Sequence, residues 1–132
     1  MTKSPLNIPM AVAASLTALG CVVHIFLGTG DILNPVLAST LDPTVQAVMA
    51  VVWHAISALL FIFAIGLAWL SRHANTPLAL VLISLNLSFV VLFLAYGVLL
   101  LGTVWPMPQW ILFGAISAAM GWGMLRAQSA AG

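Results

Sequence analysis

Long apolar runs separated by short polar breaks dominate this chain. Each run is about as long as the ~20 residues that a helix needs to cross the hydrocarbon of a bilayer. No Asp, Glu, Lys or Arg occurs between Asp42 and Arg72, or between Arg72 and Arg126. The pattern predicts four membrane-spanning helices, at about residues 9–28, 45–70, 77–101 and 108–125.

Composition narrows the class of protein. Hydrophobic residues make up 64% of the 132 residues and charged residues 4%. A chain of this length cannot enclose so much apolar surface in a water-soluble core, so we expect a single all-α domain, a four-transmembrane-helix bundle in contact with the lipid bilayer. The net charge of +1 gives no reason to expect a nucleic-acid partner. The single cysteine, Cys21, excludes an intramolecular disulfide and a cysteine-rich zinc site.

The few charges predict the orientation. Lys3, Arg72 and Arg126 fall before the first run, between the second and third, and after the fourth, while both acids, Asp31 and Asp42, lie in the first connection. Because basic residues favour the cytoplasmic side, we expect an up-down-up-down bundle with both termini in the cytoplasm. In two places a residue able to cap a helix precedes a proline, which predicts helix starts at Asp42-Pro43 and Thr76-Pro77.

The connection over residues 29–44 differs from the other two. It carries several large apolar side chains among its polar residues, which is unusual for a solvated loop. We expect this outer loop to lie on the membrane surface or to cover the outer half of the bundle as a cap.

Titratable side chains inside the apolar runs are the candidate site. At 1.5 Å rise per residue, His24, His54 and Tyr96 fall in the outer half of the bundle, with Asp31 above them. Two predicted inward faces carry the histidines. In the first helix the face consists of Ala13, Thr17, Gly20, His24 and Gly28; in the second it consists of Ala50, His54, Ser57 and Phe61.

Several functions fit two intramembrane histidines, because an imidazole in lipid needs a hydrogen-bond partner or a metal. The function we predict is a cofactor site in the outer half of the bundle, with haem b held by His24 and His54 beside Tyr96, or a divalent metal held by His24, His54 and Asp31. A second is a proton relay or small transporter. In a third the histidines are structural, and the chain is an accessory or assembly subunit of a larger membrane complex. Besides the lipid bilayer, the partners we expect are a larger membrane complex or further copies of the chain itself.

An autonomous enzyme is not expected. The chain has no Glu to act as a base, no phosphate-binding loop, and no Ser/His/Asp arrangement at matching depth.

Two segments resemble a type of small bacterial inner-membrane protein with four spans. They are His24-Ile25-Phe26-Leu27-Gly28-Thr29-Gly30-Asp31-Ile32 and Val51-Val52-Trp53-His54-Ala55-Ile56-Ser57, joined through Leu41-Asp42-Pro43. The resemblance covers roughly the first half of the chain and implies that a histidine in the first helix and a Trp-His pair in the second define the type. It implies the inner-membrane location but no activity.

Overall fold

The computed structural model describes residues 6–129 and is helical throughout apart from its connections. The elements, in chain order, are α1 (Ile8–Val23), the π-helix η1 (His24–Leu33), α2 (Asn34–Leu37), α3 (Pro43–Leu70), α4 (Thr76–Leu101) and α5 (Gln109–Ser129). Four continuous helical segments in this part of the chain are long and apolar enough to span a membrane, with α1, η1 and α2 forming the first. The all-helical, multi-pass class predicted from the apolar runs is therefore confirmed.

Helix starts follow the capping rule, with one shift. The Asp42 carboxylate accepts a 2.8 Å hydrogen bond from the backbone N–H of Thr44 at the start of α3, as expected. This bond to the charged form of the carboxyl lowers the pKa of Asp42. At α4 the cap is Asn75 rather than Thr76, because the Asn75 side chain accepts from the Leu78 N–H at 3.0 Å. At the other end of α4, Gly102 adopts φ 66°, a left-handed conformation that ends the helix.

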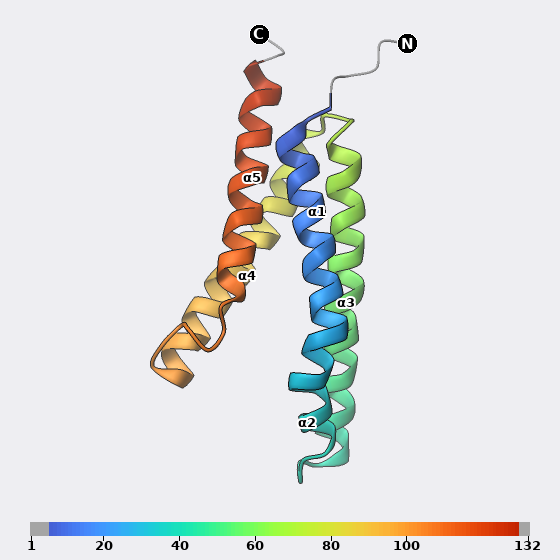
Figure 1. Ribbon diagram of the computed structural model, residues 1–132, viewed down its shortest axis with the longest axis vertical. Coiled ribbons are helices and arrows are strands. Elements are labelled where there is room, and N and C mark those ends of the chain that lie inside the picture. The colour runs from blue at the N-terminus through green and yellow to red at the C-terminus, as the bar shows by residue number, and fades with distance from the viewer. Residues whose placement is uncertain (1–5, 130–132) are drawn as a thin grey trace.

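The outer connection over residues 29–44 was expected to be a loop, and most of it is helical. The chain continues beyond Val23 as a π-helix to Leu33 and then through the short α2 (Figure 1). The Gly, Asp and Asn-Pro residues that indicated a loop are overridden by packing on α3, with Leu33 only 5% exposed. Pro35 falls in the first turn of α2, where its missing N–H is tolerated. Only the short stretch 38–42 separates this helix from α3.

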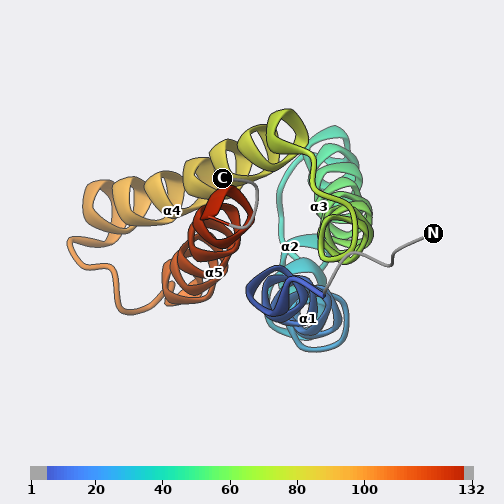
Figure 2. The same ribbon diagram turned by 90° about the horizontal axis from the view of Figure 1, so that it is seen from above.

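The helices form two pairs that meet at one end of the molecule. The segment α1–η1–α2 runs along α3, and α5 packs against both α4 and α1, while α3 and α4 touch little (Figure 1). Viewed from above, α4 extends away from α3 towards its Leu101 end (Figure 2). The bundle is therefore tight where the pairs meet and open at the opposite end.

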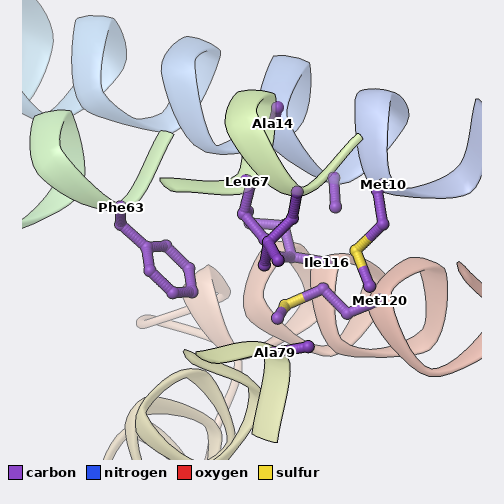
Figure 3. Packing of buried hydrophobic residues seen from close by; sticks show 9 residues of the cluster. Met10, Ala14, Phe63, Leu67, Ala79, Ile116 and Met120 are labelled. Carbon is purple, nitrogen blue, oxygen red and sulfur yellow. The ribbon is translucent and has the colours of Figure 1, made fainter. Parts of the chain in front are cut away.

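The core occupies the tight end. It combines side chains from all four long helical segments (Figure 3): Met10, Ala13, Ala14, Phe63, Leu67, Leu70, Ala79, Ile116 and Met120. Asn7, the N-cap of α1, fastens the same end with two bonds of 2.8 Å. Its N–H donates to the Ser71 carbonyl after α3, and its Nδ2 donates to the Gly123 carbonyl in α5. A smaller cluster of Cys21, Leu60 and Phe113 continues the core towards the open end.

Candidate functional site

His24 lies at the junction of α1 and η1 and is held against α3. Its imidazole stacks on the Trp53 indole, with ring centroids 4.0 Å apart and planes inclined by 20°. Its Nε2 lies 3.2 Å from the Trp53 carbonyl oxygen. A carbonyl only accepts, so Nε2 carries the proton and donates to it. The histidine thereby gains the partner that an imidazole needs inside a membrane.

Trp53 is held by two further residues of η1. Its Nε1 donates to the Thr29 hydroxyl at 3.1 Å. A Cβ placed on Gly28 would lie 3.0 Å from two indole carbons, so the absence of a side chain there lets the indole approach. A π-helix bonds residues five apart, and its wider turn helps bring His24, Gly28 and Thr29 to one face. We call His24, Gly28, Thr29 and Trp53 the Trp53 clamp.

Weaker polar contacts continue the join between α1 and α3. The Cys21 thiol, buried and free, lies 3.6 Å from the Ser57 carbonyl, and the Ser57 hydroxyl donates to the Trp53 carbonyl at 3.2 Å. One carbonyl oxygen thus accepts from both His24 and Ser57. These contacts join the first helical segment to α3 through hydrogen bonds. Each polar group named in them has a partner within this helix pair.

His54 points elsewhere. It follows Trp53 directly, and one residue of α-helix turns the side chain by ~100°. The imidazole is exposed on α3, and within residues 6–129 it makes no hydrogen bond, ion pair or ring contact. The structure therefore does not bring His24 and His54 together around a shared ligand.

The other predicted ligands are also apart from His24. Asp31 is exposed on η1, and Tyr96 is 52% exposed on α4, a helix whose backbone does not come close to that of α1 or η1 within the described residues. Within the described part of the chain, no three His, Cys, Asp or Glu residues form a group able to hold a metal ion.

The two predicted inward faces have different outcomes. The face of the first helix is confirmed: Ala13 and Thr17 are 0% and 1% exposed, and His24 contacts α3. The face of the second helix is wrong at two of its four residues, while Ala50 and Ser57 are half-buried as expected. Phe61 is 61% exposed and His54 is exposed, while the buried stripe of α3 runs through Leu60, Phe63, Leu67 and Leu70. Both stripes are apolar, so hydrophobicity cannot separate the face against protein from the face against lipid.

If α3 crosses a bilayer with the whole hydrocarbon thickness along its length, His54 lies within the hydrocarbon. The 28 residues of α3 extend over ~42 Å, which exceeds the ~30 Å hydrocarbon thickness. His54 lies ~17 Å from the Pro43 end and ~24 Å from the Leu70 end. A ~30 Å slab anywhere along this helix covers every position more than ~12 Å from both ends. The imidazole is therefore a polar group on a surface that would otherwise meet lipid.

A second buried polar group joins α4 to α5. Asn86 is 0% exposed, and its Nδ2 donates at 2.6 Å to both the Phe113 carbonyl and the Ser117 hydroxyl. Its Oδ1 has no partner among the described residues. Asn86 and Ser117 fall inside the third and fourth predicted spans, but nothing in the sequence indicates that they pair. Their bonds fix the register of α4 on α5.

Comparison with known proteins assigns neither a family nor a function to this chain. No protein family, curated protein or solved structure matches this chain. The site must therefore be interpreted from its own geometry.

Proposed function

We propose that this chain is a non-catalytic subunit of a membrane assembly, and that it binds another membrane component through the face of α3 that carries His54. In this proposal it lies in the bacterial inner membrane as an up-down-up-down bundle with both termini in the cytoplasm. The Trp53 clamp holds α3 in place, and His54 provides the polar contact.

The observation that carries the proposal is the contrast between the two histidines. His24 has a hydrogen-bond acceptor and a stacking partner within the chain, whereas His54 has neither among residues 6–129. An intramembrane imidazole that faces lipid without a partner is costly, and titratable groups in spans almost always face protein or a water-filled cavity. A partner outside this chain resolves the conflict.

The orientation rests on where the charges fall in the fold. Arg72 follows α3 at the tight end of the bundle. Arg126 lies in the last turns of α5, and the hydrogen bonds of Asn7 to Ser71 and Gly123 hold that part of α5 at the same end. Asp42 precedes α3 at the opposite end. This separation favours the tight end as the cytoplasmic one. Lys3, the third basic residue, lies outside the described residues.

A haem or divalent-metal site is compatible with the proposal only if another molecule supplies part of its ligands. The Nε2 of His24 donates to the Trp53 carbonyl and one face of its ring stacks on the indole, which leaves Nδ1 as its nitrogen with a lone pair, whereas the His54 imidazole makes no contact with the described residues. A cofactor bound there would need its remaining ligands from outside this chain. Visible absorption and elemental analysis of the purified protein test this form directly.

Lipid accessibility tests the proposal itself. Val51 lies one turn from His54 on the same face and is 68% exposed; Val91 on α4 is 63% exposed and serves as a control of equal size. Nitroxide labels at these two positions, one at a time in a Cys21→Ser background, are compared in native membranes by their collision rate with dissolved oxygen. We expect the Val51 label to be shielded and immobilised and the Val91 label to behave as lipid-exposed. Equal accessibility at both positions would contradict the proposal.

A further inference from the structure

Several small side chains flank His54 on the exposed face of α3, which also carries the larger Val51. Three alanines lie next to His54: Ala50 is one turn before it, Ala58 is one turn after it, and Ala55 is beside it. Because their side chains are short, the imidazole projects above the helix surface around it. Small residues at a helix surface let a second helix approach closely in a membrane. Small residues alone identify no partner, so the chemistry of the imidazole must decide.

Three properties of His54 point to one occupant. A neutral imidazole carries one donor and one acceptor, so it can satisfy an identical imidazole. Copies of one membrane protein share an orientation, so a two-fold axis between them runs along the membrane normal and places identical residues at the same depth. Within the described residues, the exposed side of α3 between Val48 and Leu59 carries no other side chain with a titratable group.

We propose that the component bound at His54 is a second copy of this chain, with the two α3 helices crossing so that the two His54 imidazoles hydrogen-bond to each other. This rests on the proposed function and names its partner. The site is incomplete in one copy, because each imidazole supplies the group that the other lacks. A different membrane protein on this face is the alternative that the experiment separates.

Disulfide cross-linking in native membranes tests the contact. In a Cys21→Ser background, Ala58→Cys places a thiol one turn from His54, and Ala115→Cys places one on the exposed side of α5 as a control. Mild oxidation is expected to link two copies through residue 58 and to leave the residue 115 variant monomeric. Diluting the protein within the membrane by adding excess lipid should not abolish the disulfide-linked dimer formed through residue 58.

Two substitutions at His54 then test the mechanism. His54→Leu retains an apolar surface but removes the hydrogen bond, and we expect the dissociation constant of the dimer, measured by energy transfer in bilayers, to rise by about 3- to 30-fold. His54→Asn retains a donor and an acceptor and should hold the dimer within about threefold of the unmodified protein. Equal loss in the two variants would overturn the hydrogen-bonded pair.

The combined results of the two experiments distinguish a failure of the dimer inference from a failure of the proposed function. A shielded Val51 label together with no dimer through residue 58 would overturn the second copy and leave another membrane component as the partner. A lipid-exposed Val51 label together with no dimer would overturn both. Cross-linking that is equal at residues 58 and 115 would mark random collision and also overturn the specific contact.

Discussion

Replacing each histidine in turn separates the structural imidazole from the one available to a partner. His24→Ala removes the hydrogen bond to the Trp53 carbonyl at 3.2 Å and the ring stacking at 4.0 Å. Interhelical hydrogen bonds in membranes contribute ~0.6–2 kcal/mol, and aromatic pairs add ~0.5–1.5 kcal/mol. We expect the free energy of unfolding to fall by ~1–3 kcal/mol. His54→Ala removes no described contact and should change it by less than ~0.5 kcal/mol in a monomeric preparation.

The assay is reversible unfolding in mixed micelles at a detergent concentration that keeps the protein monomeric, followed by tryptophan fluorescence. His24→Phe serves as a further variant, because it keeps an aromatic ring on Trp53 and loses the hydrogen bond, so its loss should be intermediate. A loss for His54→Ala as large as that for His24→Ala would refute the assignment of the two roles. So would an unchanged stability for His24→Ala.

Three further predictions concern single contacts. Gly28→Ala places a Cβ 3.0 Å from the clamp indole and should lower unfolding stability by ~1–3 kcal/mol in the same micelle assay, whereas Gly30→Ala meets nothing within 4 Å and should not lower it. Ser117→Ala removes a hydroxyl bonded at 2.6 Å to Asn86 and should lower stability by ~0.5–2 kcal/mol; an unchanged unfolding curve would show that this bond contributes nothing. The pKa of Asp42 is lowered by its bond to Thr44, so its helix-capping contribution should be complete above about pH 4 and fade as pH falls through the lowered pKa. In a pH series of unfolding curves, Asp42→Asn should cap equally well without that acid dependence.

The helices themselves were predictable because length and hydropathy decide membrane spans. Three of the four predicted segments match α3, α4 and α5 to within a few residues, and prolines and capping side chains fixed most of their starts. The exception is the first segment. Its glycines and Asn34-Pro35 resemble loop residues, yet packing on α3 keeps the chain helical through Leu37. That packing depends on residues distant in sequence, so local signals could not reveal it.

The candidate site was only half predictable. Small and polar residues at helical spacing correctly gave the face of the first helix, because Ala13, Thr17 and His24 all meet protein. For α3 the rule that polar groups point inward placed His54 on the wrong side. The residue that does face His24 is its neighbour Trp53, whose indole carries a donor for Thr29 and a broad surface for stacking. The adjacent Trp-His pair was visible in the sequence, but a rotation of ~100° decided which member joins α1.

Asn86 is a second residue whose contacts could not be predicted from the sequence. Its place inside the third predicted span was apparent from the sequence, but its partners lie 27 and 31 residues away on α5. Mean hydropathy and spacing carry no information about which helix a mid-membrane amide meets. Only the pairing of α4 with α5 reveals that these bonds set a helix register.

The comparison of labels at Val51 and Val91 tests the central claim most directly, because it asks whether the His54 face meets protein or lipid. In native membranes we predict an oxygen collision rate at Val51 several-fold below that at Val91, rising towards the Val91 value when His54→Leu is added. Equal rates at the two positions, unaffected by His54→Leu, would show that α3 presents His54 to lipid and would contradict the account.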